Sequence, residues 1–123
     1  MIAQGCARPM SDDVKRAYAA PFPDDSYCAG IRAFPGLIPL SPEDPEGRIN
    51  YDALKTLRKF RRPFLTAFSD SDPITRGGDL ILQRLVAGAE GRAHSTVTNA
   101  GHFLQEDAPD QVADSILRAL KAR

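Results

Sequence analysis

The stretch "FLTAFSDSDP", residues 64–73, joins a short and almost wholly apolar run to a polar loop that ends in proline. Apolar runs of this length are typical of strands in parallel sheets, where helices cover both faces of the sheet. The polar residues and the proline that follow cannot continue such a strand. We therefore predict a buried strand over residues 64–68 and a loop at its carboxyl end.

The sequence that follows repeats this order of elements. The stretch "GGDLILQRLVAG", residues 77–88, predicts a helix. Two glycines stand at its start, and a third lies just past its end. "AHSTVT", residues 93–98, predicts a second strand, and a final helix is expected from Pro109 because proline suits a first helical turn. Strand, loop, helix, strand, loop and helix in this order indicate an α/β fold with parallel strands and right-handed crossovers.

The residues before Pro63 follow another pattern. Seven of the ten prolines lie at or before Pro45, a density that excludes long helices and regular strands. Short helices are expected here instead. They cover residues 11–20 with Ser11 as N-cap, residues 26–34 with a break at Pro35, and residues 50–60 with Asn50 as N-cap.

Composition excludes several classes of function. Sixteen basic and sixteen acidic side chains cancel, so no broad field attracts nucleic acid or an anionic membrane. No apolar run reaches the roughly 20 residues that a membrane helix needs, and the first residues lack a signal-peptide pattern, so we expect a soluble, cytoplasmic chain. Cys6 and Cys28 form no CxxC or zinc pattern and are expected to be free thiols.

A second loop, within "TNAGHFLQED", residues 98–107, carries a histidine behind a glycine. Ligands of parallel sheets bind beyond the carboxyl ends of the strands, so this loop and the first one are expected at the same edge. A histidine that acts as general base needs a carboxylate to fix its tautomer. Asp72 or Asp70 would supply it for His102, unless the histidine is only a turn residue.

The other polar residues of this half have simpler interpretations. His94 is expected to be an exposed or satisfied strand histidine, and Asp72 itself can serve as a turn or N-cap residue. Glu106 and Asp107 are expected to interact with the dipole of the final helix.

Four stretches in collinear order resemble haloalkane dehalogenases of the α/β-hydrolase fold, in their carboxyl-terminal part. The stretches are "APFPDDSY" (20–27), "AGIRAFPGLIPL" (29–40), "PFLTAFSDSDPIT" (63–75) and "AGHFLQED" (100–107). The resemblance implies that residues 49–123 are the carboxyl-terminal part of the hydrolase core, with its last two parallel strands and helices. Residues 1–48 would then be the end of a helical cap domain.

The resemblance also assigns roles. It makes His102 the base that activates the hydrolytic water and Asp72 the acid that orients it, with Asp70 as the alternative acid, in an Asp-His-Asp triad. Ile74 and Phe103 would line the pocket for a small halogenated alkane, and no metal or organic cofactor is expected. Three residues would form its cap wall, unless they are simply core: Phe34, Pro35 and Ile38.

The chain departs from the family at the nucleophile. That group stands at a sharp strand-to-helix turn between two glycines four residues apart, but no two glycines here have this spacing, and tryptophan is absent. We therefore predict that the chain alone is inactive. Two alternatives stay open: the missing part made an esterase or epoxide hydrolase, or the chain is a truncated interaction module that self-associates through an exposed sheet edge.

Overall fold

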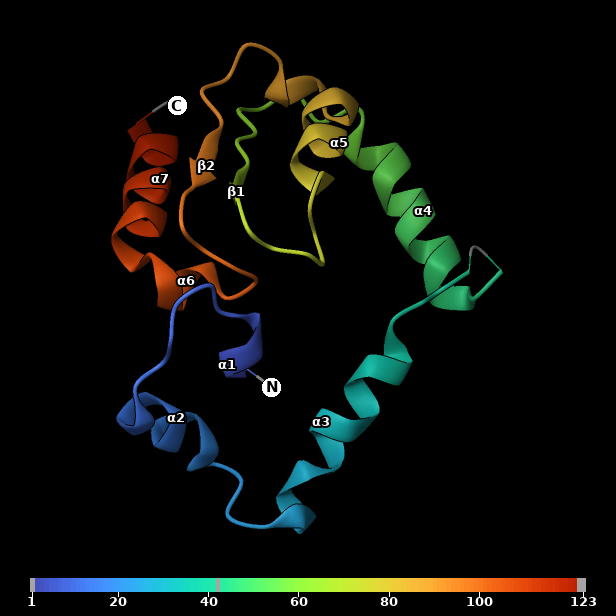
Figure 1. The fold of residues 1–123 in the computed structure, drawn as a ribbon. Helices are drawn as coiled ribbons and strands as arrows, with labels where there is room; N and C mark the ends of the chain where they lie inside the picture. The colour runs from blue at the N-terminus through green and yellow to red at the C-terminus, as the bar shows by residue number, and fades with distance from the viewer. Residues whose placement is uncertain (1, 42, 122–123) are drawn as a thin grey trace. The chain divides into compact units, whose positions relative to one another are not determined.

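A computed structural model of the chain describes residues 2–41 and 43–121 (Figure 1). The chain divides into two compact units. One unit combines the described residues of Met1–Met10 and Leu57–Arg123, and the other is Ser11–Thr56. Among the described residues, no helix has the length and apolar character needed to cross a membrane.

The first unit contains a two-stranded parallel sheet. Strand β1 (Ala67–Ser69) pairs with β2 (Ser95–Val97), and Phe68 lies opposite Thr96. Hydrogen bonds extend the pairing by one residue at each end, from Ser95 N to Thr66 O and from Asp70 N to Val97 O. The predicted parallel arrangement is therefore confirmed.

Strand β1 begins later than predicted. The amide of Phe64 donates to the carbonyl of Gly88 rather than to a strand partner, so residues 64–66 do not join the regular strand. The expected burial on both faces is also wrong: Ala67 is exposed, and Phe68 and Ser69 are only half-buried. A parallel strand is covered on both faces only when further strands and helices surround it, and the described residues provide one neighbouring strand.

The helices of this unit largely follow the prediction. Helix α5 (Gly78–Leu85) begins after Gly77, whose φ of 83° is left-handed and favours glycine, and the 3-10 helix η3 (Ala87–Ala89) follows it. Helix α7 (Pro109–Lys121) begins at the predicted proline. Two short helices were not predicted: α1 (Ile2–Gly5) and α6 (Leu104–Asp107).

A small apolar cluster lies beneath the carboxyl ends of the two strands. Val97, Ala100 and Ala108 are buried in it, and Leu104 and Val112 pack against them. The cluster thus joins β2 to α6 and α7. It supports the loop that carries the histidine.

The second unit is helical. Helix α2 (Asp12–Ala19) has Ser11 as N-cap, as predicted, and the Ser11 hydroxyl accepts from Val14 N. After it come the 3-10 helix η1 (Asp25–Cys28), α3 (Ala29–Ala33) and the 3-10 helix η2 (Phe34–Leu37). The regular helix ends before Pro35 as expected, but helical turns continue across the proline to Leu37.

The start of helix α4 (Pro45–Leu57) corrects the prediction that Asn50 is an N-cap. Proline at the first helical position has a suitable φ and no amide to satisfy. The Asp44 side chain accepts from the amides of Leu40 and Ser41, which fixes the turn before the helix. Asn50 therefore lies inside the helix, and the helix ends at Leu57 rather than Phe60.

Candidate active site

The loops that follow β1 and β2 meet at one edge of the sheet. Both strands run in the same direction, so their carboxyl ends lie side by side. The amide of Ser71, in the first loop, donates to the carbonyl of Ala100 in the second at 3.1 Å. The predicted meeting of the two loops is confirmed.

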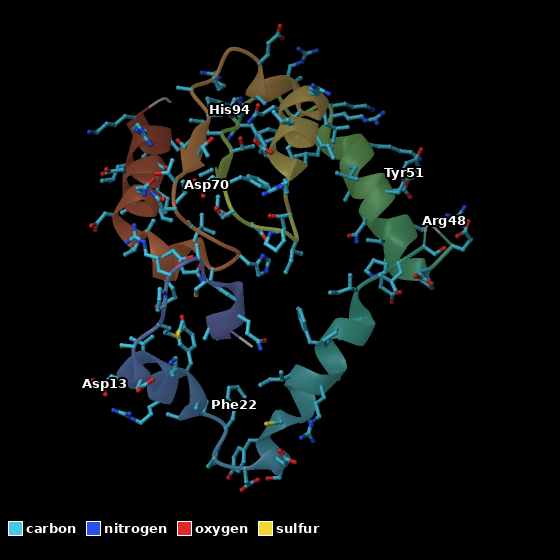
Figure 2. The ribbon with its side chains drawn as sticks, in the orientation of Figure 1. Asp13, Phe22, Arg48, Tyr51, Asp70 and His94 are labelled. Carbon is cyan, nitrogen blue, oxygen red and sulfur yellow. The ribbon has the colours of Figure 1, made fainter. Side chains whose placement is uncertain are left out.

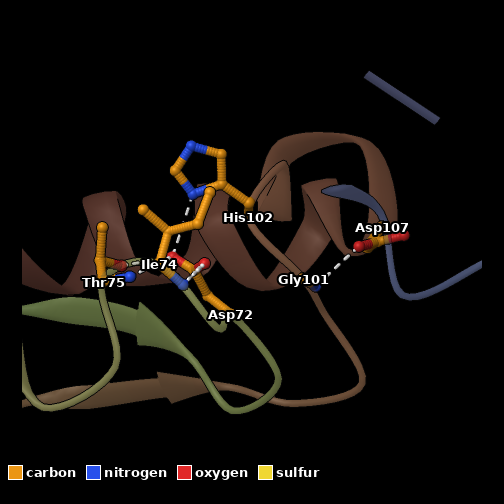
Figure 3. A network of polar contacts seen from close by, with 6 residues as sticks. All are labelled: Asp72, Ile74, Thr75, Gly101, His102 and Asp107. Atoms are coloured by element: carbon orange, nitrogen blue, oxygen red, sulfur yellow. Dashed lines mark hydrogen bonds and ion pairs between the residues drawn. The ribbon is translucent and has the colours of Figure 1, made fainter. Parts of the chain in front are cut away.

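Asp72 is buried in this edge, with 5% of its surface exposed. Its Oδ1 accepts from Ile74 N at 2.8 Å. Its Oδ2 accepts from the amide and hydroxyl of Thr75 and lies 3.1 Å from Nδ1 of His102 (Figure 3). Asp72 is thus a turn residue and a partner of the histidine at once, and the turn fixes both carboxylate oxygens.

The charge of Asp72 is stabilised despite burial. Burial opposes ionisation, but hydrogen bonds from Thr75, Ile74 and His102 outweigh it and lower the pKa of Asp72 to about 2. Near neutral pH the group is therefore an ionised carboxylate, which only accepts hydrogen bonds.

This charge determines the tautomer of His102. Since the Asp72 carboxylate can only accept, Nδ1 of His102 carries a proton, and Nε2 of the neutral ring is left as the acceptor. The His102 side chain is 34% exposed, against 6% for that of Asp72. The pair thus has a buried acid and an accessible base, the arrangement that proton transfer to Nε2 requires.

Two apolar residues predicted for the pocket lie beside this pair in sequence. The ring of Phe103 meets that of His102 edge to face, with centroids 5.1 Å apart. The side chain of Ile74 is largely exposed, while its backbone amide binds Asp72. Their role in lining a substrate pocket stays a prediction.

Asp70, the alternative acid, binds backbone instead of the imidazole. Its Oδ2 accepts from Asn99 N at 2.9 Å, and its Oδ1 accepts from Ala100 N at 3.2 Å and from the Ser71 hydroxyl. The Asn99 and Ala100 amides lower the pKa of Asp70. Asn99 has a left-handed φ of 56°, an uncommon conformation that these bonds help to hold.

Asp107 has a role that was not predicted, because it binds backbone amides far from the final helix, and its interaction with the dipole of that helix stays a prediction. It is 4% exposed, and its Oδ2 accepts from Ala7 N at 2.7 Å and Gly101 N at 2.8 Å, while its Oδ1 accepts from Arg8 N at 3.0 Å. Burial opposes its ionisation, but these amides outweigh burial and lower the pKa of Asp107. No local pattern signals this role, because Ala7 lies 100 positions away in the chain.

The backbone of residues 5–7 runs directly beside the histidine loop. Gly5 O accepts from His102 N at 2.7 Å. A Cβ on Gly101 would overlap the Gly5 carbonyl oxygen and lie 2.9 Å from Ala7 N. Glycine precedes the histidine because this close backbone approach leaves no space for a side chain.

The residues predicted for the cap wall lie in the second unit. Phe34 is 67% exposed, Ile38 is 55% exposed, and Pro35 is exposed too. The alternative that they are core residues is therefore wrong for the described chain. Their place in a substrate pocket stays a prediction.

The remaining candidates are structural. His94 Nδ1 accepts from Thr66 N at 3.2 Å, and His94 Nε2 donates to Ala89 O at 3.0 Å, so its ring is satisfied as expected. Cys6 and Cys28 are free thiols, as predicted. The described residues contain no group of three or more His, Cys, Asp or Glu side chains placed to hold a metal ion.

Several known proteins are similar in sequence to the chain. No family model matches it. The haloalkane dehalogenase of Psychrobacter cryohalolentis is 48% identical over 117 residues, which are 95% of this chain and 39% of that protein. The chain is related to haloalkane dehalogenases. Those of Mycobacterium marinum and Mycolicibacterium paratuberculosis are 41% and 42% identical over the same share of this chain.

The relationship covers less than half of each relative. The chain spans 39% of the length of the Psychrobacter and M. marinum dehalogenases. Homology to haloalkane dehalogenases implies an α/β-hydrolase fold, and the two-stranded parallel sheet is compatible with part of that fold.

Proposed function

We propose that the chain supplies the general base and the orienting acid of a haloalkane dehalogenase, with His102 as base and Asp72 as acid. The observation that carries this proposal is the 3.1 Å contact between Asp72 Oδ2 and His102 Nδ1 at the carboxyl edge of the sheet. The relatives, all named haloalkane dehalogenases, favour this reaction over ester or epoxide hydrolysis.

We propose that the first chemical step uses a carboxylate outside these residues, because no two glycines here have the spacing that flanks the nucleophile. The carboxylate oxygen attacks the carbon that bears the halogen, a carbon–oxygen bond forms, and the halide leaves with the electrons of the carbon–halogen bond. The product is an alkyl ester of the nucleophile. Neither His102 nor Asp72 reacts in this step.

The second step is the one that this chain serves. Nε2 of His102 accepts a proton from water as the water oxygen attacks the ester carbonyl. Asp72 stabilises the imidazolium, which then protonates the departing alkoxide to give the alcohol. The nucleophile is left as a carboxylic acid, and loss of its proton to solvent restores the carboxylate. Because Asp72 is already ionised and fixed by Thr75 and Ile74, the ring needs little reorganisation.

The proposal also assigns each part of the chain to a domain of the complete enzyme. We propose that residues 49–123 contribute the last two strands and helices of an α/β-hydrolase core and that residues 1–48 include the end of a cap. The described part of Met1–Met10 belongs to the unit that contains the sheet, so the cap segment would lie after it. For the complete enzyme we propose Ile74 and Phe103 as substrate-binding residues of the core, and Phe34, Pro35 and Ile38 as substrate-binding residues of the cap. We propose a small halogenated alkane as substrate and a cytoplasmic location.

The chain alone should not complete the cycle, because it has no nucleophile elbow. Halide release from a short bromoalkane should stay at background for the purified chain and for its His102→Ala variant. A chimaera in which this chain replaces the matching part of the Psychrobacter dehalogenase should release halide in a manner that depends on His102. His102-dependent release by the chain alone, or a folded chimaera without release, would overturn the proposal.

A second proposal is that the isolated chain self-associates. A groove of about 650 Å³ opens beside α7, and Ile116 and Leu120 in its wall are more than half exposed. The other lining residues are Phe60, Arg62, Pro63, Leu65 and Ala119. Exposed apolar surface and the open edges of a short, two-stranded sheet favour association between copies. Light scattering coupled to size-exclusion chromatography tests self-association, and a monomer at all concentrations would count against this proposal.

A further inference from the structure

The four residues that end in His102 share an unusual feature. All four backbone amides donate to acceptors outside their own loop. The acceptors are Asp70 Oδ2 for Asn99, Asp70 Oδ1 for Ala100, Asp107 Oδ2 for Gly101 and Gly5 O for His102. The contact from Gly101 to Asp107 is drawn in Figure 3, and Asp70 is labelled in Figure 2.

These contacts replace regular secondary structure. Residues 99–102 belong to no helix or strand, so no ladder orders their amides. Charged acceptors form stronger hydrogen bonds with amides than neutral ones do. Two carboxylates from different elements therefore bind the loop: Asp70 follows the end of β1, and Asp107 ends α6.

We propose that Asp70 and Asp107 are positioning residues that fix the backbone of residues 99–102 and thereby keep His102 Nδ1 against Asp72. The proposal rests on the proposed role of His102 as general base. Asp70 and Asp107 bind the loop backbone rather than the imidazole. They act through the backbone, and we call the pair the loop clamp.

The clamp has a functional consequence because a general base works only within hydrogen-bond reach of its partners. A side chain on a loop is placed less exactly than one on a helix unless further contacts support it. Asp107 also binds Ala7 and Arg8, so it joins the segment beside Gly5 to the same loop. Loss of either carboxylate should let the His102 ring move away from Asp72.

The isosteric Asp→Asn substitutions test this directly. Asp70→Asn and Asp107→Asn each keep one acceptor oxygen and replace the other with an NH₂ group, which cannot accept a hydrogen bond from a backbone amide. In each carboxylate both oxygens accept from backbone, so at least one bond is lost. Asp114→Asn is the matched control, because it removes one negative charge at an exposed position of α7.

The readout is the pair of imidazole ¹⁵N shifts of His102 in the labelled full chain, assigned with a His102→Gln variant. In the parent and in Asp114→Asn, the shifts should report a proton on Nδ1. In Asp70→Asn and Asp107→Asn, with unchanged circular dichroism, they should move toward a mixture of tautomers. Unchanged shifts in both folded variants would overturn the clamp.

A second measurement does not depend on any variant. Amide hydrogen exchange in the unmodified chain should be slowed at residues 99–102, relative to the intrinsic rates of exposed amides. Exchange at intrinsic rates there would overturn the proposal even if neither Asn variant folds. Halide release by the chimaera decides the proposed function separately, since the ¹⁵N shifts and the exchange rates report the clamp whether or not the chimaera is active.

Discussion

Two sides of the same folding unit differ in how far their side chains are buried and paired within this chain. At the carboxyl edge of the sheet, Asp72 and Asp107 are almost fully buried, and each accepts hydrogen bonds on both oxygens. Along α7, apolar side chains that would normally be covered are about half exposed, among them Ile116, Leu117 and Leu120. The contacts that hold the Asp72–His102 pair therefore lie within the chain, whereas the apolar side chains of α7 stay exposed to solvent.

This difference separates the two halves of the proposed reaction. Groups that hold and orient His102 come from residues 5–8, 70–75 and 99–107 of the chain itself. In our proposal, the nucleophile and the cover of the α7 flank are not supplied by these residues, in which no two glycines are four apart.

The largest effect is expected from Asp72→Asn in the chimaera. Loss of the orienting carboxylate should slow steady halide release by on the order of 10²–10⁴-fold, as expected for a disabled general base. Ester formation does not use His102, so one halide per molecule should still be released as a burst. Quenched-flow halide measurement tests this, with Asp114→Asn as the control, and steady release at the parent rate would break the assignment of Asp72.

The next effect concerns Gly101→Ala in the chain itself. The added Cβ would overlap the carbonyl oxygen of Gly5, and such overpacking costs about 1–3 kcal/mol in the free energy of unfolding. Gly30→Ala is the matched control, because a Cβ there meets nothing within 4 Å. Urea unfolding of both variants measures the difference, and equal stabilities would show that residues 5–7 do not pack on the loop.

The pH dependence of unfolding tests the charge of Asp72. Its pKa of about 2 in the folded chain lies below the unfolded value of about 4, so the unfolded state takes up the proton first as the pH falls. The contribution to stability, on the order of 2 kcal/mol, is complete above pH about 4 and is lost as the pH falls through about 2.

Asp72→Asn should therefore reduce stability in urea unfolding at pH 6 and have little effect at pH 2. An equal difference at both values of pH would contradict the charged hydrogen-bond network. Asp114→Asn again serves as the control.

The smallest effect on stability is expected at the apolar flank. Ile116→Lys replaces a side chain that is 55% exposed, and it should change the free energy of unfolding by less than about 1 kcal/mol. The same change should reduce any association between copies, measured by light scattering, and lower the binding of a dye to apolar surface. A large loss of stability would show that this flank is already part of the core.

Sequence reasoning found those features that follow from the order of strands. Parallel strands place their carboxyl ends together, so the meeting of the Asp72 and His102 loops followed from alternation of strands and helices alone. Local chemistry likewise predicted the Ser11 cap and the Pro109 start of α7. Asn50 misled the prediction, because Pro45 and the turn at Asp44 start that helix earlier.

The features that escaped prediction depend on contacts far apart in sequence. Asp107 has the local pattern of a residue near a helix start, and only the folded chain brings Ala7 and Gly101 to its oxygens. The late start of β1 has the same origin, since the carbonyl of Gly88 takes the amide of Phe64. Periodicity and capping carry no information on such partners.

The most direct test of the central claim is the Nδ1 proton of His102 in the unmodified chain at neutral pH. If this chain alone forms the acid–base pair, ¹⁵N-detected NMR should find the proton on Nδ1, and Asp72→Asn should abolish that preference. A neutral ring protonated on Nε2, or a tautomer that is unchanged in Asp72→Asn, would contradict the claim that this chain forms the pair.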